Sequence, residues 1–364
     1  MLPFTANSKR PVFIVGIGAR TPLGLNARSS AAAVRGAISA IREHPYMVDT
    51  AGEPMMVAID PVLNPKYTGI ERFLALASDA IQEALSPLAA RRLNDLRIAT
   101  VIGLPEQRPG VPHEFGAQFV QRLESEQTVL PPGSVATICA GHSGGLMAIE
   151  EAVRQIQSGE AALCLAGGVD SYMDPDTLEW LDSERQLMSA QNRSGFPPGE
   201  GAAFCLLASL ETARLYRLEI LAEILGAGSA YEDNRIKTDT VCTGTGLSQA
   251  ISLAAAALKL PDERIDFTYC DLNGERYRSE EFTFTVLRTQ AAFAEASDNL
   301  TPADCWGDTG AASGPLFASL AIAAAQRCYA KGPRSLLWTG SESGRRSAVI
   351  LKADPNPNGA ALCL

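Results

Sequence analysis

The sequence predicts an α/β fold built from two duplicated halves, and three observations support that prediction. The chain has 364 residues, which exceeds the length at which a single hydrophobic core usually stops growing. Short apolar runs alternate with long alanine-rich stretches, as strands buried on both faces alternate with helices. Similar short sequences also recur about 170 residues apart, which indicates an internal repeat.

Eight apolar runs have the composition of buried strands, four in each half. Helices between consecutive strands require right-handed crossovers, so we expect a largely parallel sheet with antiparallel pairing confined to its edges. Helices are expected at residues 146–156 and 248–258. The predicted strands cover residues 12–18, 97–104, 162–169 and 203–210 in the first half and 222–231, 264–273, 335–342 and 347–354 in the second.

The repeat can be read directly in the residues. "SGGLMA" at 143–148 followed by "ALCLAGG" resembles "SGPLFA" at 313–318 followed by "SLLWTGS". Ser143 and Ser313, which begin the first pair, are 170 residues apart. A second pair, "RIATVIGL" and "RIDFTYCDLN", begins at Arg97 and Arg264, which are 167 residues apart. We therefore expect one half to cover residues 1–215 and the other to cover residues 216–364.

Composition and charge exclude several classes of protein. Hydrophobic residues make up 46% of the chain and charged residues 20%, as in ordinary globular proteins. A net charge of −10 offers no basic field for a nucleic-acid backbone. An acidic carrier protein would need a local basic patch, but the pairs Arg91-Arg92 and Arg345-Arg346 are expected to be solvated surface residues.

The sequence predicts a cytoplasmic protein without a metal site. The N-terminus lacks the apolar core of a signal peptide, and no run of about 18 apolar residues occurs elsewhere. Eight cysteines are scattered without the spacing of a zinc site or a disulfide scaffold. Cys164 and Cys205 lie in apolar runs and are expected to be buried thiols.

Cys139 raises a sharper question, because "VATICAGHSGGLMA" at 135–148 places it where a strand-like run turns into a helix. A helix N-terminus stabilises a thiolate through its unpaired N–H groups and its dipole, and the thiolate is the nucleophilic form. Ala140, Gly141, Gly144 and Gly145 would let an acyl chain approach closely, and a free N–H would serve as an oxyanion donor. The alternative interpretation is an inert thiol buried in a subunit interface.

Three stretches resemble the β-ketoacyl synthases of the thiolase superfamily. They are "VFIVGIGARTPLGLN", "ATICAGHSGGLMAIEEAVRQIQSGEAALCLAGGVDSYMDPDT" and "FPPGEGAAFCLLASLETA". The resemblance covers residues 11–215 and implies a five-layer αβαβα fold with a nucleophilic cysteine at the start of a central helix, here Cys139. It also implies a homodimer formed through a first-half strand, with "AALCLAGGV" and the helix at 146–156 as the suitable pieces.

The resemblance further implies a substrate carried on an acyl-carrier protein or coenzyme A. The phosphopantetheine arm of that carrier would be the only cofactor, with no metal.

The second half lacks the two histidines that the resemblance implies for decarboxylative condensation. The chain has only His44, His113 and His142. By order and spacing, Asn273 in "CDLNGERYRSEEF" and Asp308 in "CWGDTGAASG" take the two histidine positions. Asn273 is predicted to donate an N–H to a thioester oxygen, and Asp308 to act as a base. The alternatives are a turn signal for Asn273 and a helix N-cap for Asp308.

Other residues are assigned to the surroundings of Cys139. His142 lies one helical turn further on, and we interpret it as a polar interface or substrate-contact residue rather than the base. Glu342 and Gly344 in the final strand turn, together with Thr243 before the helix at 248–258, are expected to line the substrate site. Glu200 between two glycines is expected to brace a loop.

These features leave three functional hypotheses. The first is an acyltransferase that accepts an acyl group on Cys139 and then favours acyl transfer or thioester hydrolysis over condensation. The second is a non-catalytic partner of an intact synthase, similar to a chain-length factor, although such partners commonly lose the cysteine. The third is a scaffold or binding protein that has kept only the fold.

Overall fold

The computed structural model describes residues 10–93, 96–125 and 130–354. All eight predicted strands are present, with bounds that differ from the prediction by a few residues. The first half contains β1 (Val12–Arg20), α1 (Ala27–Arg35), β2 (Arg42–Val48), β3 (Pro54–Val57), α2 (Gly69–Ala89), β4 (Ala99–Leu104), α3 (Phe115–Ser125), β5 (Val135–Cys139), the 3-10 turn η1 (Gly141–Ser143), α4 (Gly144–Ser158), β6 (Leu163–Ser171), α5 (Pro175–Ser183), β7 (Glu200–Ser209) and α6 (Leu210–Leu215).

The second half repeats the plan with fewer additions. It contains β8 (Ala222–Tyr231), α7 (Thr245–Ala255), β9 (Phe267–Cys270), α8 (Arg276–Thr289), η2 (Gln290–Ala292), β10 (Asn299–Leu300), α9 (Ala303–Trp306), η3 (Gly310–Ala312), α10 (Ser313–Gln326), β11 (Arg334–Gly340) and β12 (Arg345–Lys352).

The order of the strands confirms the duplication. Within the described residues, ten strands follow the order β10-β9-β11-β12-β8-β1-β7-β6-β4-β5. Each half therefore contributes five strands in the same arrangement, and the two sets meet where β8 pairs with β1. The position of the boundary near residue 215 remains a prediction.

The expectation of a largely parallel sheet is wrong in one respect. Antiparallel pairs occupy the middle of the sheet, from β6 through β7, β1, β8 and β12 to β11. Parallel pairs are confined to the two outer parts, where β4 lies between β5 and β6 and β9 lies between β10 and β11. The first strand of each half pairs antiparallel with that half's last strand, a connection that apolar runs alone do not specify.

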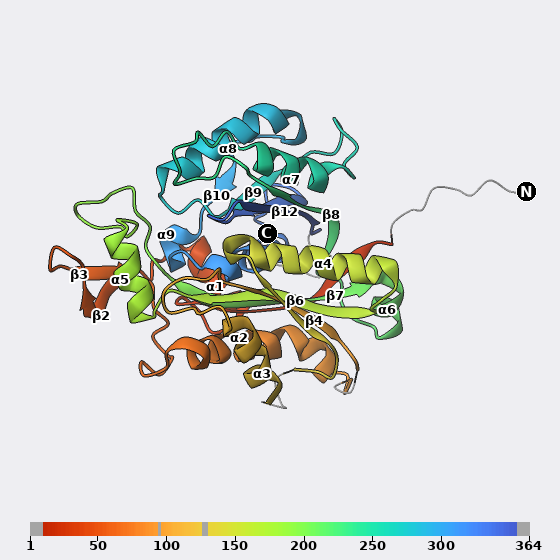
Figure 1. Ribbon diagram of the computed structural model, residues 1–364. Helices are drawn as coiled ribbons and strands as arrows, with labels where there is room; N and C mark the ends of the chain where they lie inside the picture. Colours follow the sequence, from red (N-terminus) through yellow and green to blue (C-terminus); the bar gives the residue numbers. More distant parts are fainter. Residues whose placement is uncertain (1–9, 94–95, 126–129, 355–364) are drawn as a thin grey trace, which may run out of the picture.

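Helices and strands form the predicted five layers (Figure 1). α2 packs on β1, β7 and β6, whereas α7 packs on β8 and β12. α4 contacts strands of both halves, including β6 and β12, and α10 likewise contacts β7 and β11. These two helices therefore lie between the two sections of sheet and form the central layer.

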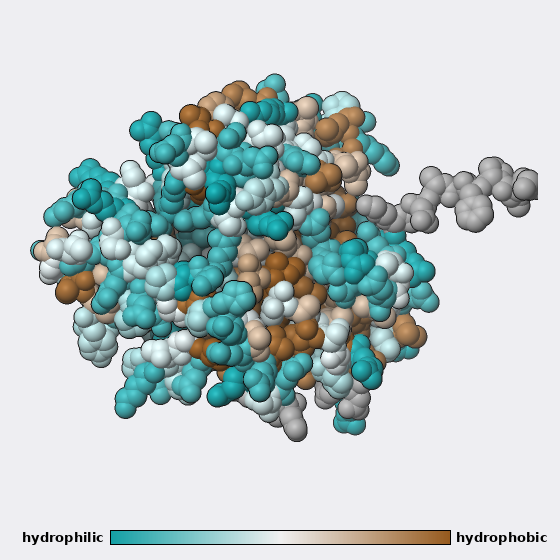
Figure 2. Space-filling model, viewed as in Figure 1, coloured by the Kyte–Doolittle hydropathy of each residue, from teal (hydrophilic) through white to brown (hydrophobic). Residues whose placement is uncertain are grey.

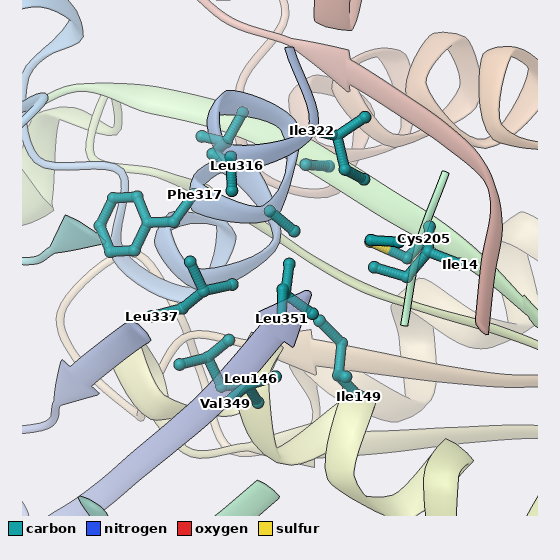
Figure 3. Close-up of a cluster of buried hydrophobic side chains, with 14 of the residues drawn as sticks. Ile14, Leu146, Ile149, Cys205, Leu316, Phe317, Ile322, Leu337, Val349 and Leu351 are labelled. Carbon is teal, nitrogen blue, oxygen red and sulfur yellow. The ribbon is translucent and has the colours of Figure 1, made fainter. Parts of the chain in front are cut away.

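α10 is buried along almost its whole length, as a helix between two sheets must be, whereas α4 buries one apolar face and keeps polar residues such as Arg154 at the surface. Figure 3 shows Leu146 and Ile149 of α4 facing the same cluster as Leu316 and Phe317 of α10. Strand residues of both halves complete the cluster, among them Cys205, which is buried as predicted.

The strand chosen for a dimer interface lies in the interior. All nine residues of β6 are buried, and β4 and β7 occupy its two edges. The helix at 146–156 belongs to the central layer. β6 therefore cannot pair edge to edge with a second copy, and within the described residues the free edge of the first-half sheet is β5.

Among the described residues, no helix has the length and apolar character needed to cross a membrane.

Candidate functional site

The site begins where β5 ends and the central helix α4 starts. Cys139 is the last residue of β5, paired in register with Leu104 of β4, and its side chain is exposed. The backbone then turns through Gly141, which has a φ of +55° that favours glycine, into η1 and α4. His142, not Cys139, therefore occupies the start of the helix, which corrects the expected placement of the thiol.

The small residues of this turn allow protein backbone to approach the helix start. A Cβ built on Gly145 would lie 2.4 Å from the carbonyl oxygen of Ala311, and one built on Gly144 would lie 3.0 Å from that of Ile138. The first distance is too short for a side chain, and the second would require the strand to shift by a few tenths of an ångström. Gly144 and Gly145 thus allow close contacts with β5 and η3.

The environment of Cys139 does not favour a thiolate. Partial burial raises the pKa of the thiol, and a hydrogen bond with Thr137 only partly opposes that shift. None of the hydrogen bonds or ion pairs found in the described residues joins Cys139 to Asn273 or Asp308. Cys139 ends β5 and lies ahead of η1 and α4, so it lacks the helix N-terminus that was expected to stabilise its thiolate.

His142 instead forms the centre of the site. Its Nε2 atom lies 2.9 Å from both carboxylate oxygens of Asp308, and both side chains are almost fully buried. The sequence placed these residues 166 positions apart, and the packing of η1 against η3 brings them together.

Asn273 joins the same cluster and uses its whole amide there. Its Nδ2 atom donates to Asp308 at 2.7 Å and to Glu275 at 3.1 Å, and its Oδ1 atom accepts the N–H of Glu275. An amide nitrogen has two protons, so neither remains for a thioester oxygen. The contact with Glu275 also supports the alternative interpretation of Asn273 as a turn residue.

The acceptor capacity of Asp308 is filled as well. Besides His142 and Asn273, it accepts the backbone N–H of Gly310 at 2.8 Å. Asp308 therefore receives a backbone N–H at the entry to η3, although the N-cap residue of η3 is Thr309 and the same carboxylate also binds His142. A carboxylate held by three donors is poorly suited to act as a base.

The pKa values of His142 and Asp308 shift in opposite directions. Burial opposes a charged imidazole, but the carboxylate of Asp308 outweighs that cost and raises the pKa of His142. Burial also opposes ionisation of Asp308, yet the charge and hydrogen bond of His142, together with Arg278, lower the pKa of Asp308 well below its usual range. Both shifts favour an imidazolium paired with a carboxylate.

Sequence reasoning missed Arg278, which connects this pair to a wider network. Arg278 is 3% exposed and forms ion pairs with Asp271 and Glu275. It also donates to the carbonyl oxygen of Gly340 at 2.8 Å. The only available signal was the alternation of charge in "DLNGERYRSEE", which is equally typical of an exposed helix.

The residues predicted to line a substrate site separate into two groups. Glu342 shares a small pocket of about 70 Å³ with His142, and Lys237 forms an ion pair with Glu342. Gly344 lies in the turn between β11 and β12, where its carbonyl oxygen accepts the N–H of Glu232. Thr243 contacts Arg288 of α8. Neither Gly344 nor Thr243 lines the pocket of His142.

Two further sequence interpretations can be compared with the structure. Glu200 does brace its surroundings, since it is fully buried and accepts from Arg72, Ser171 and the backbone of Asp60. Arg346 is not a solvated surface residue, because its side chain is fully buried in an ion pair with Glu281 at 2.6 Å.

Comparison with protein families supports the resemblance seen in the sequence. A family profile described as "Beta-ketoacyl synthase, N-terminal domain" matches residues 131–213. A putative polyketide beta-ketoacyl synthase 1 of Streptomyces cyaneus is 29% identical over 198 residues, which are 50% of this chain and 44% of that protein. The 3-oxoacyl-[acyl-carrier-protein] synthase 2 of Staphylococcus aureus is 26% identical over 291 residues, 68% of this chain and 69% of the relative.

Solved structures agree on the fold. The ishigamide ketosynthase/chain length factor superimposes with a TM-score of 0.77 at 18% identity, covering 95% of this chain and all of that one. A beta-ketoacyl synthase from Burkholderia phymatum gives a TM-score of 0.76 at 19% identity, covering 94% and 99% of the two chains.

Proposed function

We propose that this chain is a divergent member of the β-ketoacyl synthase family of the thiolase superfamily. Within that family, it would serve as a non-condensing partner of an intact synthase. The observation that carries the proposal is the closed network of His142, Asp308 and Asn273 at the start of α4. The resemblance implies a nucleophilic cysteine at that position. A protonated imidazole has no free electron pair with which to attack a thioester.

The network also leaves no group for the second chemical step. Asn273 has no free N–H for a thioester oxygen, and Asp308 has no free base function. The retained cysteine was the argument against a partner role. That argument is weakened because Cys139 lies at a strand end, away from this network.

In this proposal the acyl-carrier protein and its phosphopantetheine arm, or coenzyme A, serve the cysteine of the partner synthase. One of the structural relatives is titled a ketosynthase/chain length factor, which is consistent with a paired arrangement. The same edge of the sheet would serve a homodimer or a heterodimer.

Pairing would use the free edge strand β5, since an unpaired edge exposes backbone N–H and C=O groups to another chain. Figure 2 shows hydrophobic residues gathered in the middle of the viewed face, beside and below the place of α4 in Figure 1. A covered interface is expected to be apolar in this way.

The pairing predicts a specific loss of assembly. Replacing Ala136, an exposed residue of β5, with arginine should abolish co-purification with an intact family synthase expressed in the same cells. Ala51→Arg, at an exposed residue between β2 and β3, should leave the complex unchanged. Native mass spectrometry distinguishes a heterodimer from a homodimer, and a strictly monomeric chain that captures no synthase would refute the proposal.

A second candidate function is acyl transfer through Cys139, which the exposure of that thiol favours. Intact-mass measurement after incubation with an acyl-CoA or an acyl-carrier protein separates the two candidates. The partner role predicts the unmodified mass for both wild type and Cys139→Ala. An acyl adduct on the wild type that disappears in Cys139→Ala would instead establish the acyltransferase.

A further inference from the structure

A second and larger pocket lies between α1 and α10, away from the His142 network. Its volume is about 920 Å³, at the upper end of the range of roughly 300–1,000 Å³ typical of small-molecule sites. None of the residues that line it lines the pocket of His142. Nothing in the proposed function uses it.

The pocket is open because two helical faces meet with small side chains. On α1 the lining positions are spaced as one face of a helix, with two alanines between two arginines. On α10 the lining positions have the same spacing and carry one large apolar residue. These faces are Arg28, Ala31, Ala32 and Arg35 on α1, and Ser319, Ile322, Ala323 and Gln326 on α10.

The floor of the pocket is apolar and belongs to the core. Ile322 is 2% exposed, and Figure 3 shows it on α10 within the central cluster. Ala31 is also buried and belongs to the same cluster. An apolar ligand body placed on this floor would be removed from water over much of its length.

The rim is positive, although the chain carries a net charge of −10. Arg28, Arg35 and Arg327 all line the pocket, and within the described residues none of their side chains forms an ion pair. The guanidinium of Arg35 lies over the ring of Tyr329, 4.1 Å from its centroid. Arg327 also acts on Tyr329, since both arginines oppose the rise that burial causes in the pKa of this phenol. Arg35 and Arg327 therefore lie at the same end of the pocket, beside Tyr329.

The opposite end holds one carboxylate, that of Glu83. Its oxygens accept the backbone N–H groups of Ala19 at 2.8 Å and Ala27 at 2.9 Å. Glu83 is thus occupied with the entry to α1 and does not pair with the arginines. An anion entering the pocket would be directed toward the end formed by Arg35 and Arg327.

We propose that this pocket binds a single-chain amphipathic anion, a fatty carboxylate or an alkyl phosphate. A carboxylate or phosphate head group would lie between Arg35 and Arg327, because guanidinium groups bind planar or tetrahedral anions through paired hydrogen bonds. The alkyl chain would lie over Ala31, Ile322 and Ala323. The proposal rests on this pocket alone and does not depend on pairing with a synthase.

Isothermal titration of the full chain tests the chemistry of the ligand. Decanoate and decyl phosphate represent the two possible head groups, decanol represents the chain alone, and inorganic phosphate represents the head alone. We expect one site that binds at least one of the two amphipathic anions, with decanol and phosphate binding at least tenfold more weakly. Preference for one anion then identifies the head group. Equal binding of decanol, or no binding of either anion, would overturn the proposal.

Variants locate the site. Arg35→Gln combined with Arg327→Gln should weaken anion binding at least tenfold, and Ala32→Trp should block it by filling the open side of the pocket. Arg276→Gln, at an exposed arginine of α8, should bind like the wild type. Circular dichroism melting of each variant separates loss of binding from loss of fold. Unchanged affinity in folded forms of both pocket variants would exclude this location.

Discussion

Replacing Asp308 with asparagine is expected to lower the free energy of unfolding by about 3 kcal/mol at pH 5.5, because it breaks a buried ion pair. The substitution leaves the imidazole of His142 without its carboxylate in a site that is almost closed to water. His142 must then lose its proton in order to stay buried, against its tendency to be protonated in the unfolded chain at that pH.

The effect should depend on pH in a direction set by the two groups. The pKa of folded His142 lies above its ordinary value of 6.5. Its contribution is therefore fully present below pH 6.5 and is lost as the pH rises through the folded-state value. Asp308 has a lowered pKa, so its contribution is present above about 3.8 and is lost as the pH falls below that value. Arg278 and Asp271 also act on His142, and they stay in place in the variant.

Urea denaturation of wild type and variant at pH 5.5 and pH 9 measures this difference. The destabilisation should be smaller at pH 9 by at least about 1 kcal/mol, the equivalent of roughly one pKa unit. Asp304→Asn, at an exposed residue of α9, should change stability by less than about 0.5 kcal/mol at either pH. A destabilisation by Asp308→Asn that is identical at both pH values would show that the pair is not ionised.

The second large effect is expected at Arg72 of α2, which lies far in sequence from the start of α4. Arg72 binds both oxygens of Glu200 at 2.6 Å, and neither side chain is appreciably exposed. Arg72→Ala leaves a buried carboxylate without its cation, so we expect a loss of about 3–5 kcal/mol in unfolding free energy.

A double variant distinguishes the ion pair from simple loss of volume. Arg72→Met combined with Glu200→Gln removes both charges and keeps a side-chain oxygen for the backbone N–H of Asp60, so it should recover much of the stability lost in Arg72→Ala. Arg276→Ala, at an arginine side chain that is 84% exposed, serves as the control and should have little effect. A double variant less stable than Arg72→Ala would contradict this explanation. The measurement is urea denaturation at pH 7.

Glu200 illustrates how far sequence reasoning reached into the fold. Its position between glycines indicated a bracing role, and the structure confirms that role. Its partner Arg72 is 128 residues away, and nothing in the local sequence of α2 distinguishes an arginine that points inward from one that points to solvent. Arg346 was misplaced for the same reason, because a pair of adjacent arginines on a strand directs the two side chains to opposite faces.

At the start of α4, too, the local sequence did not specify which residue faces the site. The strand-to-helix turn after residue 135 was correctly located, but its register was displaced by three residues. Cys139 and His142 both lie in a run of small residues that has no strong period. Contacts with the second half, such as that of Gly145 with η3 and the hydrogen bond of Ser143 to Ser341, fix which residue faces that half.

The sequence by itself determined the α/β class, the eight principal strands, the duplication and the absence of histidines after His142. Those properties follow from local composition and from repetition along the chain. Tertiary structure alone decided the antiparallel middle of the sheet, the burial of β6, and the joining of His142, Asn273 and Asp308. These depend on contacts between residues that are distant in the chain, such as His142 and Asp308 at a separation of 166 positions, and local periodicity does not encode them. The sequence predicted a reactive thiol at Cys139 with Asp308 as its base, whereas the structure joins His142, Asp308 and Asn273 in a closed set of hydrogen bonds.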